Sequence, residues 1–75
     1  MSISNKVKGL LQIQGKKNVE LANYLGIAPQ SLANKFNRDS FSGADLIRIA
    51  DFLNCEVAFI LADKQQITLT MDDIK

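Results

Sequence analysis

The side chains between Pro29 and Asn37 have types and a spacing that suggest recognition of a ligand through hydrogen bonds. This segment predicts a short helix, because proline is favoured in a first helical turn and Leu32 and Phe36 lie four residues apart. The other faces present amides and small side chains, whereas exposed helix surfaces are more often filled with glutamate and lysine. Amides donate and accept hydrogen bonds together, so this surface suits hydrogen-bonded recognition. Its polar members are Gln30, Ser31, Asn34 and Asn37.

The composition argues against catalytic and metal chemistry. The chain has no histidine and one cysteine, Cys55, which excludes a Cys/His zinc site, an intrachain disulfide and a histidine-based triad. No carboxylate is paired with a nucleophile, a phosphate loop or a metal-ligand spacing. We therefore expect no enzyme activity, cofactor, metal or small-molecule substrate. Cys55 is expected to be a buried small hydrophobe.

The length and hydropathy predict one small domain spanning residues 1–75. The longest apolar run, from Val57 to Ala62, has six residues, against about twenty for a membrane span. The first residues lack the apolar stretch of a signal peptide. We therefore expect a cytoplasmic protein with no membrane contact.

The net charge of +1 conceals an asymmetry along the chain. Residues 1–38 contain six basic side chains and one acid, whereas residues 39–75 contain three basic side chains and seven acids. This distribution predicts a basic face, which attracts polyanions.

Apolar side chains three and four residues apart predict four helices. Gly15 and Gly26 supply the positive φ that ends the first two, and Ser42 with Asp45 forms a capping box before the fourth. Gly9, inside the first helix, predicts a close approach by a neighbouring helix. The cap of the first helix is Ser2 or Ser4. The predicted helices cover about residues 3–15, 18–25, 29–37 and 43–53.

The last twenty residues change to a period of two, which predicts strands at about residues 56–61 and 66–71 joined as a β-hairpin. The connecting residues 62–65 lack the Asn-Gly or Asp-Gly signal of a tight turn. The alternative makes residues 56–62 a fifth helix.

The second and third predicted helices form the most informative pattern in the chain. A short helix, a tight turn at Gly26 and a second helix define a helix-turn-helix. Ala22 is small where the second helix must cross closely, and Leu32 anchors that helix. In this geometry the second helix enters the DNA major groove with its N-terminal end first.

Residues 3–55 resemble the phage-repressor/Cro-type helix-turn-helix regulators, also called the xenobiotic-response-element (XRE) family. The resemblance implies a mostly α fold, a four-helix repressor-like domain with a C-terminal β-hairpin, or alternatively an all-α five-helix domain. It also implies a DNA-binding transcriptional regulator of the repressor kind. Lys35 departs from the family's usual aliphatic residue, and we expect Phe36 to supply the packing while the Lys35 amine stays in water. The matching residues are Leu21-Ala22, Leu25-Gly26-Ile27, Gln30-Ser31-Leu32, Phe36-Asn37 and the helix after Ser42.

The resemblance places the base-reading positions on the helix at 29–37. The amides of Gln30 and Asn34 can form paired hydrogen bonds with adenine, each worth about 1–3 kcal/mol of discrimination. Ser31 would reach a base or a phosphate, and Pro29 and Ala33 would contact a thymine methyl group. The residues expected to hold the DNA backbone are Lys17, Asn18, Lys35, Asn37 and Arg38.

The apolar tail predicts how two chains would combine. One module of this size reads few base pairs, so regulators with this motif bind palindromic double-stranded DNA as dimers, with half-sites about 34 Å apart. We expect a homodimer through residues 56–71, by edge pairing or face packing, that Ile60→Asp would split. The alternative is a hairpin that closes the core of its own chain. The expected interface residues are Val57, Phe59, Ile60, Leu61, Ile67 and Leu69.

The sequence is also compatible with a second class of function. The same fold also serves in antitoxin-like or adaptor proteins, which bind other proteins and have no operator of their own. The basic half of the chain favours DNA binding. The apolar hairpin and the acidic half are compatible with the interaction module.

Overall fold

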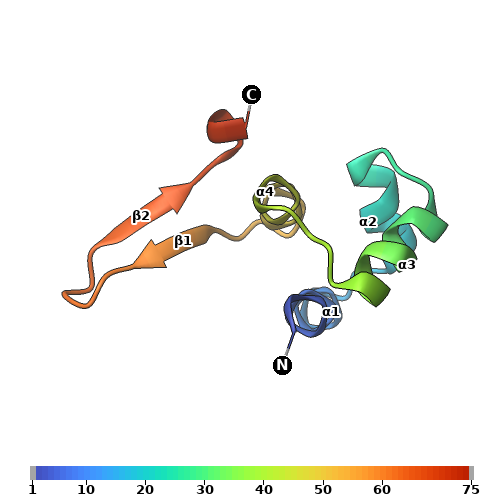
Figure 1. Ribbon diagram of the computed structural model, residues 1–75, viewed down its shortest axis with the longest axis horizontal. Helices are drawn as coiled ribbons and strands as arrows, with labels where there is room; N and C mark the ends of the chain where they lie inside the picture. Colours follow the sequence, from blue (N-terminus) through green and yellow to red (C-terminus); the bar gives the residue numbers. More distant parts are fainter. Residues whose placement is uncertain (1, 75) are drawn as a thin grey trace.

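The computed structural model describes residues 2–74 as four helices followed by a two-stranded antiparallel hairpin and a short 3-10 helix (Figure 1). The predicted fold class, mostly α with a C-terminal hairpin, is confirmed, and the all-α alternative is wrong. Met1 and Lys75, part of the predicted domain span 1–75, lie outside the described residues. The elements are α1 (Ile3–Gln14), α2 (Asn18–Leu25), α3 (Pro29–Arg38), α4 (Gly43–Phe52), β1 (Val57–Ile60), β2 (Gln66–Leu69) and η1 (Met71–Ile74).

Local capping accounts for most helix ends. Gly15 and Gly26 follow α1 and α2 with φ of 68° and 73°, as predicted. The N-terminus of α4 has the predicted capping box: the Asp45 N–H donates to Ser42 Oγ and the Ser42 N–H donates to Asp45 Oδ2, both at 3.0 Å. Ser2, and not Ser4, caps α1, because its Oγ accepts the Asn5 N–H at 3.1 Å.

The core lies among the four helices and orients α3. Leu32 is 1% exposed and fixes α3 against α2, where Ala22 is fully buried. Phe36 packs edge-on against Phe41, with ring centroids 5.3 Å apart. The core cluster comprises Val7, Leu11, Leu21, Ala22, Leu32, Phe36, Phe41, Ile49 and Leu53.

Gly9 is not explained by packing within the chain. No atom outside its own helix lies within 4 Å of where a Gly9 Cβ would stand. The prediction that a neighbouring helix approaches Gly9 is therefore wrong within one chain, and the space beside it is open.

The hairpin projects from the helices as an arm, on the side away from α2 and α3 (Figure 1). Val57 pairs with Leu69 and Phe59 pairs with Ile67, so one face of the hairpin is entirely apolar. Ile60 pairs with Gln66 and therefore lies on the opposite face. Phe59 and Ile67 are 66% and 60% exposed, which shows that the outer part of the hairpin does not cover the core of its own chain.

Candidate nucleic-acid interface

The turn between α2 and α3 has the geometry expected of a helix-turn-helix. The Gly26 N–H donates to Asn23 O at 3.2 Å and the Ile27 N–H donates to Ala22 O at 3.1 Å, which satisfies the last carbonyls of α2. Three residues, 26–28, then separate the two helices. This arrangement presents α3 at the surface with its buried side, Leu32 and Phe36, held against the core.

The exposed surface of α3 brings the predicted base-reading side chains together. Gln30 and Asn34 lie one helical turn apart, and Gln30 Nε2 donates to Asn34 Oδ1 at 3.3 Å. Ser31 and Pro29 are exposed beside them, while Ala33 is half-buried. The amide–amide hydrogen bond aligns two donor–acceptor groups along one face, and both remain accessible to a ligand.

The first turn of α3 is open to an anion, whereas the first turn of α2 contains an acidic residue. Ala28 precedes α3 and offers no side-chain cap, and no acid lies in the first turn, so N–H groups there keep their positive character toward solvent. At α2 the Lys17 N–H donates to Glu20 Oε2 at 2.8 Å. The Glu20 carboxylate thus places a negative charge at the N-terminus of α2, which makes that end less favourable for an anion than the N-terminus of α3.

Ser4 clamps the C-terminal end of α3 to α1. The Ser4 hydroxyl lies 2.8 Å from both Phe36 O and Asp39 Oδ1, and the Ser4 N–H donates to Asp39 Oδ1 at 2.7 Å. Ser4 is 4% exposed, so these bonds are protected from water. Asp39 itself takes a left-handed conformation, φ 54°, as it ends the helix. Sequence reasoning missed this contact, because 35 residues separate the partners.

Four of the five predicted phosphate-contacting side chains are exposed: Lys17, Asn18, Asn37 and Arg38. The fifth, Lys35, has another partner. Its Nζ lies 3.0 Å from Asp45 Oδ2 in a partly buried ion pair that joins α3 to α4. The Lys35 side chain is 32% exposed, and the sequence expectation of an amine in water did not anticipate this ion pair.

These contacts lower the pKa of two carboxyl groups. The hydrogen bonds from the Ser4 hydroxyl and N–H hold the pKa of Asp39 below its ordinary value of 3.8. Burial raises the pKa of Asp45, but the Ser42 N–H and the charged amine of Lys35 outweigh it, so the pKa of Asp45 is also lowered.

Acid should therefore destabilise the fold. A carboxyl whose pKa is lower in the folded chain stabilises it at pH above its unfolded value and loses that contribution as pH falls through the folded value. We expect the urea midpoint to be nearly constant between pH 7 and about pH 5 and to fall below about pH 4. Asparagine tolerates the same left-handed φ as aspartate but has no carboxyl group to titrate. In the Asp39→Asn variant the fall of the urea midpoint with acid should therefore be shallower. An unchanged acid slope in that variant would contradict the role of Ser4.

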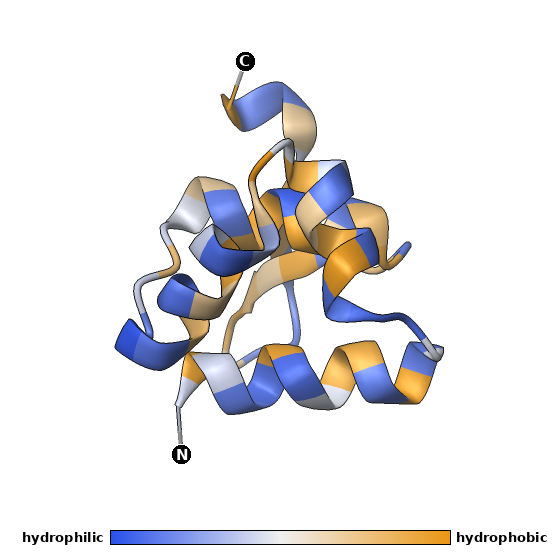
Figure 2. Cartoon of the chain, turned by 90° about the vertical axis from the view of Figure 1, so that its right-hand side faces the viewer, coloured by the Kyte–Doolittle hydropathy of each residue, from blue (hydrophilic) through white to orange (hydrophobic). Residues whose placement is uncertain are grey.

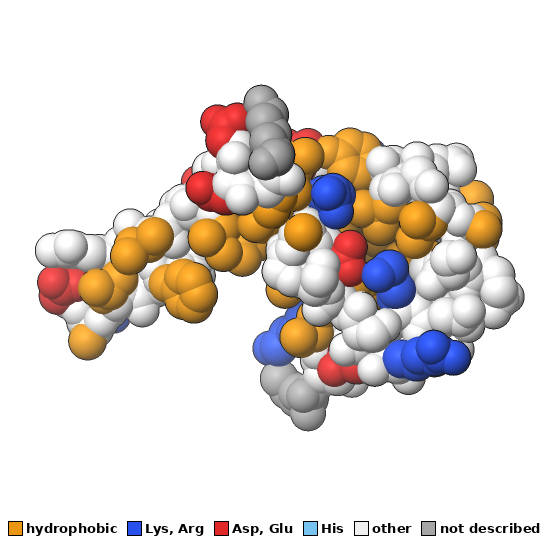
Figure 3. Space-filling model, turned by 45° about the horizontal axis from the view of Figure 1, so that its top comes forward, with side chains coloured by type: hydrophobic (Ala, Val, Ile, Leu, Met, Phe, Trp, Pro, Cys, Tyr) orange, Lys and Arg blue, Asp and Glu red, His pale blue; other side chains and the backbone are white. Residues whose placement is uncertain are grey.

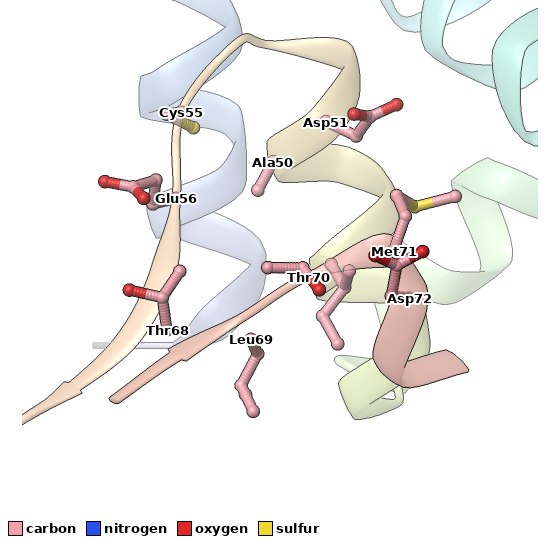
Figure 4. A pocket seen from close by; sticks show the side chains of 10 residues that line it. Ala50, Asp51, Cys55, Glu56, Thr68, Leu69, Thr70, Met71 and Asp72 are labelled. Carbon is pink, nitrogen blue, oxygen red and sulfur yellow. The ribbon is translucent and has the colours of Figure 1, made fainter. Parts of the chain in front are cut away.

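A separate cavity of about 300 Å³ lies between α4, β2 and η1, with Asp51, Glu56 and Asp72 among its lining residues (Figure 4). Asp51 accepts a hydrogen bond from the Tyr24 hydroxyl, which raises the pKa of Tyr24. Three carboxylates make this cavity unsuitable for nucleic acid. Cys55 lines it and is exposed, so the prediction of a buried Cys55 is wrong: the chain turns outward at Asn54, φ 56°, before reaching the hairpin.

Within residues 2–74, no helix is long and apolar enough to cross a membrane. The same residues contain no cluster of acidic or sulfur side chains that could hold a metal ion.

The two helices, their three-residue turn and the exposed amide face of α3 define a repressor-like helix-turn-helix domain. The model of the bacteriophage CI repressor helix-turn-helix domain family matches residues 6–68. The chain belongs to this family, which is one of DNA-binding regulators. No curated protein and no solved structure matches the chain significantly.

Proposed function

We propose that this protein is a sequence-specific transcriptional repressor that inserts α3 into the major groove of a palindromic operator. The observation that carries the proposal is the exposed pair of Gln30 and Asn34, whose side-chain amides hydrogen-bond to each other. The opposite side of the same helix is fixed in the core. Each amide matches the donor and acceptor that adenine offers in the major groove. Ser31, Pro29 and Ala33 complete the base-facing surface.

The backbone of the DNA would be held at both ends of the motif. The open N-terminus of α3 favours one phosphate, and the exposed Lys17, Asn18, Asn37 and Arg38 can contact others. Lys35 is left out of this set, because its amine is already paired with Asp45.

Selection from randomised duplex DNA, followed by fluorescence anisotropy at several salt concentrations, tests this function. We expect an enriched palindrome, and an affinity that falls steeply with salt because phosphate contacts release counterions. Lys17→Ala and Arg38→Ala should each weaken binding to all sequences and reduce the salt slope by about one, since each removes one phosphate-binding side chain. Absence of binding even at low salt would favour an antitoxin-like or adaptor protein of the same fold.

The homodimer in this proposal uses the apolar face of the hairpin. Ile67 lies on that face and Ile60 on the other, and their exposures are similar at 60% and 67%. If two apolar faces pack together, Ile67→Asp should raise the dimer dissociation constant at least tenfold. The sequence alone led us to expect that Ile60→Asp would split the dimer, but Ile60 lies on the other face, so Ile60→Asp becomes the matched control. If the dimer instead forms by edge-to-edge pairing of strands from the two hairpins, Ile67→Asp and Ile60→Asp should change the dissociation constant by similar amounts. Sedimentation velocity over a concentration series distinguishes these results.

A further inference from the structure

The hairpin by itself offers too little surface for a stable dimer. Each strand has four residues, so one face of the two strands measures about 13 Å by 10 Å. A typical stable interface buries about 800 Å² per partner. A dimer built on the hairpin therefore needs further contact with the body of the second chain.

The outer side of α1 carries an apolar groove that no part of its own chain fills. Leu10 and Ile13 line it, with Ile13 82% exposed, and its volume is about 380 Å³. Leu10 also lines a second groove, of about 110 Å³, together with Val57 at the base of the hairpin. Through Leu10 the apolar surface continues from α1 to the inner end of the hairpin.

The figures show the two parts of this surface. Apolar residues recur along α1, the helix beside the N-terminus, in Figure 2. Apolar side chains are also exposed along the projecting hairpin in Figure 3. An arm with an apolar face and a body with an apolar groove are complementary shapes on one chain, which is the requirement for a symmetric pair.

Gly9 is the second observation that points to a docked partner. It lies in the same groove, one turn from Ile13, and the space beside it is empty. Glycine inside a helix is unfavourable compared with alanine. A close approach by another chain gives this residue a role that packing within the chain does not.

The charges on α1 and on the hairpin are compatible with contact between them. Helix α1 contains Lys6 and Lys8 and no acid, and Lys6 lines the groove. The hairpin, residues 57–69, contains one acid, Asp63, and one lysine, Lys64, so its net charge is zero. Its apolar face therefore meets no like charge on the basic α1, and the choice of α1 as the docking surface rests on the groove and on Gly9.

We propose that the groove on α1 around Gly9, Leu10 and Ile13 receives the hairpin of a second copy of this chain, reciprocally in both directions. The apolar face of each hairpin then lies between the two bodies. This inference rests on the homodimer of the proposed function and names the surface that completes it.

The test is the dimer dissociation constant of full-length variants, measured without DNA by sedimentation equilibrium. Ile13→Asp should weaken the dimer at least tenfold, although Ile13 contributes nothing to the core. Val19→Asp, at an exposed apolar position on α2, should leave the dimer unchanged. Gly9→Ala should raise the thermal midpoint of the dissociated chain and yet weaken dimerisation.

A mixing experiment distinguishes reciprocal docking from contact between hairpins alone. Chains with Ile13→Asp and chains with Ile67→Asp each lack both contacts as homodimers, but a mixed pair keeps one intact groove and one intact hairpin that face each other. We expect the mixture to associate more tightly than either variant alone. A wild-type dissociation constant for Ile13→Asp, an equal loss in Val19→Asp, no gain on mixing, or a monomeric wild type would each overturn the proposal. Ile13→Asp should leave the affinity of one chain for a single half-site unchanged. Measuring that affinity separates failure of the proposed dimer contact from failure of the proposed DNA binding.

Discussion

Replacing both Gln30 and Asn34 with alanine should greatly reduce the sequence preference of this protein at the bases that these two amides contact. Each bidentate amide–adenine pair is worth about 1–3 kcal/mol of discrimination, and about 1.4 kcal/mol corresponds to a factor of ten in affinity. We expect operator affinity to fall at least about fivefold for each amide–adenine pair removed from a half-site, with the effect seen in both halves of a palindrome. Anisotropy titrations with the selected operator and with a scrambled duplex measure the difference.

The folded state should be unaffected by this double substitution, because both side chains are exposed and hydrogen-bond to each other on the surface of α3. Binding to scrambled DNA should also persist, since phosphate contacts supply it. Gln14→Ala removes an exposed amide on α1 and provides the control. If the double variant keeps the preference of the wild type, α3 does not read bases through these amides.

Phe36→Ala should remove a large part of the stability of the domain. Phe36 is 6% exposed and contacts the Phe41 ring, and burial losses of this kind cost about 3–5 kcal/mol. A chain of 75 residues is expected to have about 4–11 kcal/mol in total. Circular dichroism during urea unfolding should therefore show a large fall in the midpoint, with DNA binding lost at the same time.

Phe59→Ala is the matched control, because the same truncation occurs at a side chain that is 66% exposed. It should keep the helical spectrum and the urea midpoint when measured at dilutions where chains are dissociated. Equal destabilisation by the two substitutions would mean that the hairpin, and not only the helical core, carries the fold.

Local signals in the sequence predicted the parts of this fold that depend on neighbouring residues. The left-handed glycines 15 and 26, the capping box at Ser42 and the alternating hairpin each involve residues within one turn or one strand pair. Contacts between distant residues were missed. Ser4 and Asp39 meet because α1 crosses the end of α3, and Lys35 reaches Asp45 because α4 begins beside α3. Neither pairing has a spacing that could be read along the chain.

The candidate site shows the same division. The spacing of Gln30 and Asn34 placed them on one face, which a helical period is sufficient to establish. The availability of each basic residue depends on tertiary partners, so Lys35 could not be told apart from Arg38 by its type. Likewise, burial of Cys55 was inferred from apolar neighbours in sequence, while the backbone turn at Asn54 directs it outward.

The clamp between Ser4 and α3 has a consequence for the length of DNA between two half-sites. It joins α3, the helix that we propose reads the DNA, directly to α1, and α1 is also the proposed docking surface for the second chain. The distance and the angle between the two α3 helices of the dimer would then be fixed. One extra base pair at the operator centre moves a half-site by about 3.4 Å and turns it by about 34°. A rigid pair of chains cannot follow that change, so we expect the protein to tolerate base substitutions at the centre of the operator far better than insertions.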